Sequence, residues 1–331
     1  MPKVVVVLVN YRSWKDTVEC LSSLIGLDYK DFGIVVVDNA SSDGSYEAMT
    51  AWLKTCFSAA RDVYAELSES DVSRYPGVAR SDVFFDGRIP VVTLESVSNG
   101  GFAYGSNMGM AIASKYDDCR YFWILNNDTV VARDSLRFLV ERMESAEEGE
   151  KLGIIGGKLK YYDRRNIIQG VGGAFNRFLG VGRNIGSGEM DRGQYDNDEI
   201  NKRMDYVIGA CMLVRREFFE DVGPMCEDYF LYYEEIDWAL RGKRKGWKMA
   251  YSWQAVVYHK EGASISPGGG GKSELSDYYW LRNRVKFTLR FYPLFLPLVM
   301  LGFLPVVINR IRRKQLGRLW NVLLGRVPAN G

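Results

Sequence analysis

The stretch YFWILNNDT, residues 121–129, is the part of the sequence that decides the fold. Its apolar run, Tyr121 to Leu125, predicts a buried strand, because short apolar runs bounded by turn formers are typical of one. Asn126, Asn127 and Asp128 follow at its carboxyl end, where open α/β sheets bind ligands. A carboxylate beside amide oxygens suits a hard divalent cation. An Asx-rich turn that caps the next helix explains these residues equally well.

The composition is that of a globular protein. The chain has 331 residues, 47% hydrophobic and 25% charged, which is enough for a sizeable core. A formal net charge of +2 gives no reason to expect a nucleic-acid partner. The five cysteines form no CxxC pair, which favours reduced thiols over disulfides or structural zinc. We expect no signal peptide, because the first apolar run is too short.

Three further apolar runs predict a parallel sheet. They are KVVVVLVN at residues 3–10, FGIVVV at 32–37 and VVTL at 91–94. Helices are predicted after the first run, with Ser13 or Asp16 as a cap, and over about residues 46–57. Strands that alternate with helices form βαβ units, so we expect an α/β fold with helices on both faces of a mostly parallel sheet. Residues 59–90 are charged and weakly patterned, and we interpret them as a surface insertion.

Polar side chains stand at the ends of the predicted strands. Asn10 and Tyr11 follow the first strand, and Asp38 and Asn39 follow the second. The ends of parallel strands meet at one edge of a sheet, where an acidic residue such as Asp38 can bind a nucleobase or a ribose. The glycine fingerprint of dinucleotide folds is missing after the first strand, where the chain reads NYRSWK. This argues against a nicotinamide dehydrogenase.

A glycine-rich segment, NGGFAYGSNMG, occupies residues 99–109. Glycine lets a backbone approach a ligand closely, and the helix that follows would offer N–H groups to an anion. A plain glycine-rich turn is equally consistent with the spacing.

The motifs VNY, VVDNASSDGS, NGGFAYGSNMG and ILNNDT, in this order, resemble those of family 2 glycosyltransferases, and most closely the rhamnosyltransferase-like branch of bacterial surface-glycan synthesis. The resemblance covers roughly residues 3–283. It implies a GT-A fold, which is Rossmann-like, and a nucleotide diphosphate sugar as donor, with dTDP-rhamnose expected. The implied donor-binding residues are Asn10, Tyr11, Asp38, Asn39, Asn99, Gly101, Phe102, Asn107 and Asn127.

The same resemblance aligns residues 126–128 with the metal-binding DxD motif of the family. Asn126 replaces its first carboxylate, so Asp128 is the main candidate ligand for Mg²⁺ or Mn²⁺ and Asn126 a weaker one. Residues 247–258 predict a pair of strands that ends at His259, the one histidine of the chain. The family has a histidine here, so His259 is expected to coordinate the metal or contact the departing diphosphate. Packing is the plainer alternative.

The stretch YFLYYEEIDWALR, residues 229–241, predicts a helix that opens on Glu234, Glu235 and Asp237. Carboxylates in a first turn are favoured by the helix dipole, which is the plain interpretation. The family places a carboxylate pair here, and the match selects Glu235 as general base, although the family has an aspartate. Helical spacing puts Glu234 and Asp237 on one face and turns Glu235 about a quarter-turn away.

Two basic or glycine-rich segments follow. PGGGGKS, residues 267–273, is not a P-loop, because Ser266 stands where that motif requires glycine. We expect either a loop over the donor or a linker. In YYWLRN and the residues after it, Arg282 and Arg284 are expected to meet a pyrophosphate or to snorkel at a membrane edge.

The uncharged run of residues 291–309 is long enough to span a membrane. Its three prolines and Gly302 argue against one straight helix, so we expect a re-entrant or interfacial anchor. Residues 311–324 predict a basic amphipathic helix at the membrane surface. Pairing of such helices in a homodimer is the alternative.

These expectations divide the chain into a nucleotide-sugar-binding half (1–130), an acceptor-binding half (131–286) and a membrane-associated tail (287–331). They describe a metal-dependent, inverting glycosyltransferase at the cytoplasmic face of the bacterial inner membrane. Its acceptor would be a hydroxyl of a lipid-linked or polysaccharide glycan. The altered NND and Glu-Glu motifs keep one alternative open, a catalytically silent protein of the same fold that binds partners or glycan at the membrane.

Overall fold

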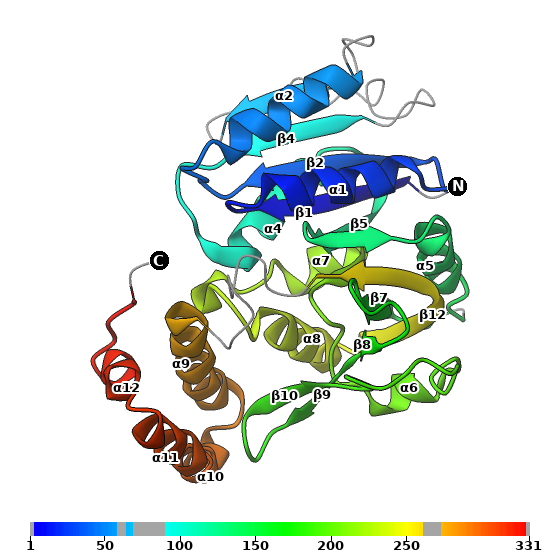
Figure 1. The fold of residues 1–331 in the computed structure, drawn as a ribbon. Coiled ribbons are helices and arrows are strands. Elements are labelled where there is room, and N and C mark those ends of the chain that lie inside the picture. The colour runs from blue at the N-terminus through cyan, green and yellow to red at the C-terminus, as the bar shows by residue number, and fades with distance from the viewer. Residues whose placement is uncertain (1–2, 58–63, 69–89, 148, 261–272, 329–331) are drawn as a thin grey trace.

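The computed structural model describes residues 3–57, 64–68, 90–147, 149–260 and 273–328. Within these ranges the centre of the protein is a ten-stranded sheet in the order β3-β4-β2-β1-β5-β11-β7-β12-β6, with β8 paired to β7 (Figure 1). Its strands are β1 (Lys3–Asn10), β2 (Phe32–Asp38), β3 (Tyr64–Ser68), β4 (Val91–Glu95), β5 (Cys119–Asn126), β6 (Thr129–Val131), β7 (Leu152–Tyr161), β8 (Ile168–Gly170), β11 (Cys211–Arg215) and β12 (Lys248–His259).

The sheet is mostly parallel, as predicted. β1 runs parallel to β2 and β5, and β4 runs parallel to β2 and β3. β11 is antiparallel to both β5 and β7, and therefore joins the N-terminal strands to the C-terminal ones in one continuous sheet.

Helices cover both faces of this sheet. Because strand side chains alternate between faces, Val5 and Val7 of β1 join one apolar core while Val4, Val6 and Leu8 join the other. The first core packs α4 (Gly101–Ala113), α7 (Arg216–Val222) and α8 (Glu234–Arg244); the second packs α1 (Trp14–Ile25), α2 (Ser45–Phe57) and α5 (Ser135–Glu144). A central strand covered on both faces must be apolar throughout, which explains the valine run of β1.

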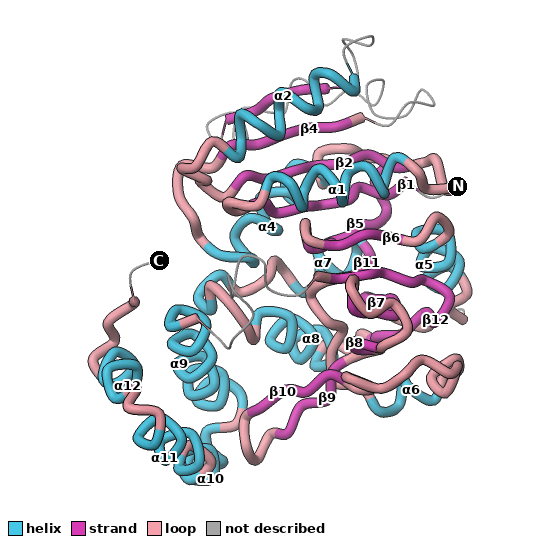
Figure 2. Tube along the Cα trace, in the orientation of Figure 1, coloured by secondary structure: helices cyan, strands magenta, loops and turns pink. Residues whose placement is uncertain are grey.

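The C-terminal helices stand beside the sheet rather than on it (Figure 2). They are α9 (Glu274–Phe291), η3 (Pro293–Phe295), α10 (Leu296–Leu301), α11 (Leu304–Arg312) and α12 (Leu316–Leu323). The hairpin of β9 (Gly173–Asn176) and β10 (Val181–Asn184), followed by α6 (Glu199–Arg203), completes the fold.

Buried Arg284 of α9 fixes the tail to the rest of the protein. Its Nε donates to the carbonyl of Leu179 at 2.7 Å, and its two Nη atoms lie 3.4 Å from the carbonyls of Val299 and Gly302. Gly302 must be small here, since an added Cβ would lie 2.4 Å from Arg284 Nη2. The expectation that Arg284 meets a pyrophosphate or a membrane edge is therefore wrong, because its guanidinium is occupied inside the protein. Arg282 likewise donates to the carbonyl of Asp228.

Three other expectations about elements also need correction. Residues 247–258 form one long strand, not a pair, although its register with β7 shifts after Ser252. Residues 311–324 do not form one helix, because the chain breaks at Lys314, whose φ is +55°. Within the supposed insertion, Tyr64–Ser68 is an edge strand paired with β4. Residues 58–63 and 69–89, and the glycine-rich loop up to residue 272, lie outside the described residues.

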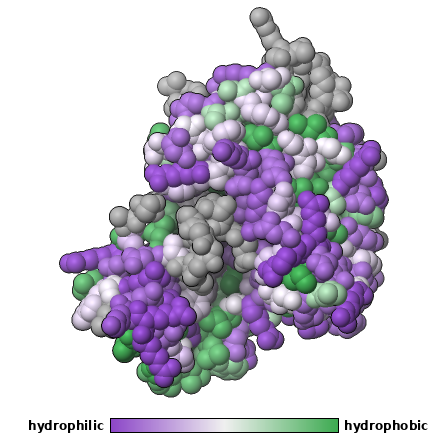
Figure 3. All heavy atoms as spheres, in the orientation of Figure 1, coloured by the Kyte–Doolittle hydropathy of each residue, from purple (hydrophilic) through white to green (hydrophobic). Residues whose placement is uncertain are grey.

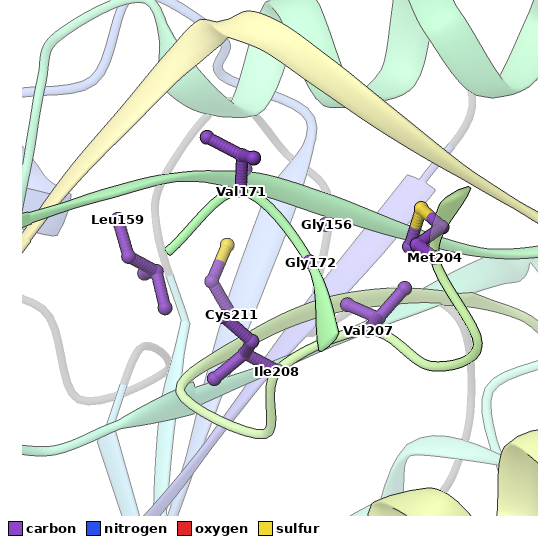
Figure 4. Close-up of a pocket in the computed structure, with 9 residues that line it drawn as sticks. Gly156, Leu159, Val171, Gly172, Met204, Val207, Ile208 and Cys211 are labelled. Carbon is purple, nitrogen blue, oxygen red and sulfur yellow. The ribbon is translucent and has the colours of Figure 1, made fainter. Parts of the chain in front are cut away.

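A small apolar gap lies between β7, the end of β8 and the segment before β11 (Figure 4). Leu159, Val171, Val207 and Cys211 line it, and it leaves no room for a water-sized molecule. An added Cβ on Gly156 would already lie 2.7 Å from Val207 Cγ1. This gap is a feature of core packing, and the candidate site must be sought at the strand ends.

Candidate active site

The ends of β1 and β2 are joined by a buried carboxylate. Asn10 and Asp38 are register partners, and Asn10 Nδ2 donates to Asp38 Oδ2 at 2.6 Å. The backbone N–H of Ser41 donates to Asp38 Oδ1 at 2.7 Å. Both oxygens of Asp38 therefore accept a hydrogen bond already, and each has capacity for one more. The half-buried Tyr11 follows Asn10 in the chain, and its ring lies under the Arg12 guanidinium at 5.1 Å.

Asn39 presents a buried acceptor atom whose orientation is fixed by its neighbours. Its Nδ2 donates to Asn99 Oδ1 at 3.0 Å and to the carbonyl of Gly101 at 2.9 Å. Asn99 Oδ1 also accepts from the N–H of Gly101, so it must be the oxygen, and Asn39 must offer its nitrogen. Asn39 Oδ1 is left buried with no hydrogen-bond partner among the described residues. Such an atom is typical of a site that a ligand completes.

The start of α4 is packed against the segment before α8. The N–H of Phe102 donates to the carbonyl of Phe230 at 3.1 Å. An added Cβ on Gly101, whose φ is +87°, would lie 2.1 Å from that same oxygen. Glycine is required here for a contact within the protein, whatever its role toward a ligand. The N–H groups of both Gly101 and Phe102 are already bonded, so neither is open to an anion.

Two of the predicted donor-binding residues use their amides to join elements of the protein. Asn127 Nδ2 donates to Ser13 Oγ at 2.7 Å and to Thr17 Oγ1 at 2.9 Å, and so ties the end of β5 to α1. Ser13 consequently does not cap α1 with its side chain. Asn107 exchanges hydrogen bonds with the backbone of Met225 at 2.9 and 3.0 Å. We infer that these two residues hold in place the elements that surround the site.

The predicted metal-binding residues converge at the end of β5. Asp128 Oδ1 lies 3.1 Å from His259 Nε2, and Asn126 Nδ2 lies 3.3 Å from the same nitrogen. The sheet causes this meeting, because His259 pairs with Thr129 and the N–H of Lys260 donates to the carbonyl of Asp128 at 3.0 Å. All three residues predicted from the sequence are thus brought together.

The geometry fits a divalent cation. Adjacent ligands of an octahedral ion with bonds of about 2.1 Å stand about 3 Å apart, close to the 3.1 Å between Asp128 Oδ1 and His259 Nε2. His259 Nδ1 lies 2.8 Å from Oε1 of buried Gln169, which favours the tautomer that leaves the Nε2 lone pair facing Asp128. Asp128 and His259 would hold the ion, with oxygen ligands from a substrate completing the shell; Asn126 would join them through its oxygen only after its amide turns over, because its nitrogen faces His259 here. No cluster of three His, Cys, Asp or Glu side chains that could hold a metal exists in the described ranges, so the protein alone would supply only part of the coordination shell of the ion.

Gln169 was not predicted from the sequence. It lies on β8, and its contact with His259 depends on the pairing of β8 with β7 and of β7 with β12. Nothing in the local sequence around Gln169 marks it as a partner of a histidine.

The three acids of α8 have different surroundings. Asp237 is fully buried, and it accepts from Arg241 Nε at 2.6 Å, from Arg290 Nη1 at 3.0 Å and from the Tyr229 hydroxyl at 3.0 Å. Glu234 and Glu235 each keep one oxygen, Oε2, buried and without a partner in the described part of the chain. Asp237 is therefore a structural ion-pair residue, whereas the two glutamates have the unsatisfied oxygens of a reactive site.

Burial raises the pKa of both glutamates. Loss of solvent disfavours the charged carboxylate at Glu235, and at Glu234 the neighbouring charge of Glu235 raises the pKa further. A carboxylate whose pKa is raised by burial is suited to accept a proton in general base catalysis.

Similar proteins are consistent with this site. Residues 4–62 match the family described as glycosyl transferase family 2. The low-salt glycan biosynthesis hexosyltransferase Agl10 of Haloferax volcanii is 22% identical over 240 residues, which cover 72% of this chain and 61% of the relative. The N-acetylglucosaminyl-diphospho-decaprenol L-rhamnosyltransferase of Mycobacterium tuberculosis is 22% identical over 311 residues, 86% of this chain and 88% of the relative.

The solved structure of a mannosyltransferase from Pyrobaculum calidifontis, in complex with GDP-Man and Mn²⁺, superposes with a TM-score of 0.54. It is 14% identical and the match covers 98% of this chain and 85% of that one. The fold is therefore the GT-A fold, with a helical C-terminal tail. The family match and the curated relatives support a place in family 2 of the glycosyltransferases and glycosyltransferase activity.

Proposed function

We propose that this protein is an inverting, metal-dependent glycosyltransferase that moves a sugar from a nucleotide diphosphate to a hydroxyl group of a glycan acceptor. The observation that carries the proposal is the meeting of Asp128, His259 and Asn126 at the carboxyl edge of a GT-A sheet. A carboxylate, an imidazole and an amide oxygen can hold Mg²⁺ or Mn²⁺, which supplies the positive charge that a departing diphosphate needs.

The donor nucleotide would bind along the ends of β1 and β2. Asp38 and Asn39 offer acceptor atoms there, and the unpartnered Asn39 Oδ1 suits an N–H of a nucleobase or a ribose hydroxyl. Tyr11 offers an aromatic face at the same edge. These groups recognise a nucleoside, and dTDP-rhamnose is the donor we favour, from the motif resemblance and from the named activity of the mycobacterial relative.

Glu235 would act as the base. In an inverting transfer the acceptor oxygen bonds to the anomeric carbon while the bond from that carbon to the diphosphate oxygen breaks. The hydroxyl proton passes to the Glu235 carboxylate, and the electron pair of the broken bond stays with the diphosphate. A carboxylate without a competing hydrogen bond on Oε2 is suited to accept that proton.

The acceptor would be a lipid-linked glycan reached from the cytoplasmic face of a membrane. By length and composition, Pro293–Arg312 is the one segment among the described residues that is apolar enough to cross a membrane, with a mean hydropathy of 2.0. The carbonyl bonds of Arg284 and the ion pair of Arg310 with buried Asp277 at 2.5 Å hold this segment against α9. We therefore favour a tail that lies on the membrane surface.

The exposed face of the tail fits a bilayer. Figure 3 shows apolar residues gathered over α10 and α11 at the lower edge of the molecule. The sequence after Lys286 contains no acidic residue, so a second copy of the tail would face like charges whereas anionic lipid would be attracted. The exposed apolar residues are Leu294, Leu298, Met300, Leu301, Leu304, Ile308, Ile311, Trp320, Leu324 and Val327.

The proposal is tested with the purified full chain, Mn²⁺ or Mg²⁺, and a panel of nucleotide diphosphate sugars. Release of nucleoside diphosphate identifies the donor, and transfer to a lipid-diphosphate-linked sugar identifies the acceptor. We expect one donor to be turned over much faster than the rest, with inversion at the anomeric carbon seen by NMR. Binding of nucleotides without turnover of any donor would favour the catalytically silent alternative.

A further inference from the structure

We propose that Asn283 is a positioning residue that holds the segment Tyr229–Tyr233, here called the pre-α8 loop, in the conformation that presents Glu235. The catalytic consequence rests on the proposed function. The hold on the loop stands on the geometry alone and is measured separately below.

The pre-α8 loop has an unfavourable backbone. Phe230, Tyr232 and Tyr233 have φ values of +66°, +67° and +78°, although none of them is glycine. Positive φ costs bulky residues roughly 1–2 kcal/mol each. Such a loop keeps its conformation only where its surroundings enforce it, so the contacts that enforce it must lie outside the loop.

Asn283 supplies these contacts from α9. Its side chain is fully buried, and Nδ2 donates to the carbonyls of Tyr229 and Leu231, each at 2.8 Å. The carbonyl of Tyr232 lies 3.2 Å from the same nitrogen and shares its two hydrogens. Arg282 Nη1 donates to Asn283 Oδ1 at 3.0 Å, which fixes the amide with its nitrogen toward the loop. One side chain thus binds three backbone carbonyls of the strained segment.

Two further contacts place the same face of α9 against the loop. The hydroxyl groups of Tyr232 and Ser276 lie 3.2 Å apart, and the ring of Phe230 stacks on Tyr279 with centroids 4.7 Å apart. Ser276, Tyr279 and Asn283 therefore form a continuous surface that matches the loop, with Asn283 as its buried polar centre.

The loop in turn sets the direction of Glu235. Tyr233 is the N-cap of α8, in the left-handed conformation and without a side-chain cap bond, and Glu234 and Glu235 follow at once. Because their Oε2 atoms have no partner within the described ranges, the backbone of this first turn decides where the carboxylates point. Since a misplacement of about 1 Å costs roughly 10²-fold in rate, release of the loop should reduce turnover.

The test compares Asn283→Ala with Asn201→Ala. Asn201 Oδ1 accepts the N–H of Tyr251 at 2.8 Å, so its loss destabilises the fold away from the loop. For each full-length variant, kcat and KM of transfer, the Kd of UDP, GDP and dTDP, and hydrogen–deuterium exchange of residues 229–240 are measured. We expect Asn283→Ala to lower kcat about 10²-fold with nucleotide Kd unchanged, and to speed exchange of this segment about tenfold. Asn201→Ala should change neither.

Unchanged exchange of residues 229–240 in Asn283→Ala, or a fall in kcat no larger than that of Asn201→Ala, overturns the proposal. If Asn283→Ala does not fold, Ser276→Ala removes one hydroxyl contact of the same surface, and the same pair of effects is required in weaker form. If the wild-type chain transfers no sugar while Asn283→Ala still releases the loop, the proposed function fails and the structural role of Asn283 stands.

Discussion

Asp128 Oδ1 lies 3.1 Å from His259 Nε2, although Asp128 follows β5 and His259 ends β12, the last strand of the sheet. β6 and β12 create this proximity by pairing antiparallel, directly beyond the end of β5. A carboxylate and an imidazole at this separation, with the imidazole oriented by Gln169, are prepared for a shared cation.

The first prediction follows from this pair. Asp128→Ala should abolish Mn²⁺-dependent transfer, because the protein offers few other anionic ligands for the ion. Transfer is measured over a titration of Mn²⁺, and Asp134→Ala is the control, because Asp134 precedes α5 with a side chain that is 44% exposed and makes no cap bond. Full turnover of Asp128→Ala in the presence of a chelator would rule out this role.

Gln169→Ala should weaken metal binding without removing a ligand of the ion. Loss of the Gln169 carbonyl frees His259 to rotate and to change tautomer, and changes of this kind typically cost roughly 10–100-fold in metal affinity. The Mn²⁺ concentration for half-maximal activity should therefore rise, while kcat at saturating Mn²⁺ changes less. An unchanged Mn²⁺ requirement would show that His259 is not oriented through Gln169.

Glu235→Gln and Asp237→Asn should differ in kind. Removing the base lowers kcat by roughly 10²–10⁴ while donor binding persists. Asp237→Asn instead removes the charge of a buried carboxylate that pairs with Arg241 and Arg290, so it should mainly lower the free energy of unfolding. Kinetics and thermal unfolding of both variants separate the two roles. Normal turnover of Glu235→Gln with an inactive Asp237→Asn would exchange the assignments.

The pH dependence of kcat should reflect the raised pKa of the buried glutamate Glu235. Burial raises the pKa of Glu235, and the base works only when ionised. Activity should therefore fall with decreasing pH at a pH well above the ordinary glutamate pKa of about 4.3. The same shift means that the folded state loses stability as pH rises through this range, because the folded protein keeps the Glu235 proton to a higher pH than the unfolded chain does. An acidic limb near pH 4 would contradict the assignment.

Membrane binding should depend on the exposed leucines of the tail. Leu294 and Leu301 are 90% and 61% exposed. Burial of each side chain in the bilayer should contribute roughly 1.5 kcal/mol to the binding free energy, which is about tenfold in affinity. Leu294→Ser with Leu301→Ser should weaken co-sedimentation with vesicles that contain anionic lipid. Val97→Ser, at an 80% exposed apolar residue far along the chain, should have no effect. Pairing of tails would be supported if the wild-type chain does not bind vesicles but dimerises with rising concentration, and if the double variant abolishes that dimerisation.

The sequence predicted the sheet well because its strands are apolar on both faces, which leaves a strong local pattern in β1, β2 and β5. The resemblance to the family, rather than the strand pattern, implied that Asn126, Asp128 and His259 act together, and the three residues do meet in the structure. Tyr64–Ser68 was missed because a short, partly exposed edge strand carries no such pattern. The donor-binding and catalytic assignments stay predictions that the experiments above address.

The remaining contacts of the site depend on distant parts of the chain. Gln169 and Asn283 act through pairings that no local spacing reveals. The need for glycine at residue 101 could not be read from the local sequence, because the atom it must admit, the carbonyl of Phe230, lies on another segment. Arg284 was expected at a surface because charge normally stays there, whereas three carbonyls satisfy it inside.

The contact between Gly101 and Phe230 limits how enzymes of this kind can be recombined. A chimera that exchanges residues 1–130 for those of a relative imports a new start to α4 but keeps the old pre-α8 loop. Any donor segment with a side chain at the position of Gly101 would collide with the Phe230 carbonyl and displace the loop beside Glu235. A chimera designed to change the donor should therefore transplant residues 229–233 along with residues 1–130, or retain the native glycine.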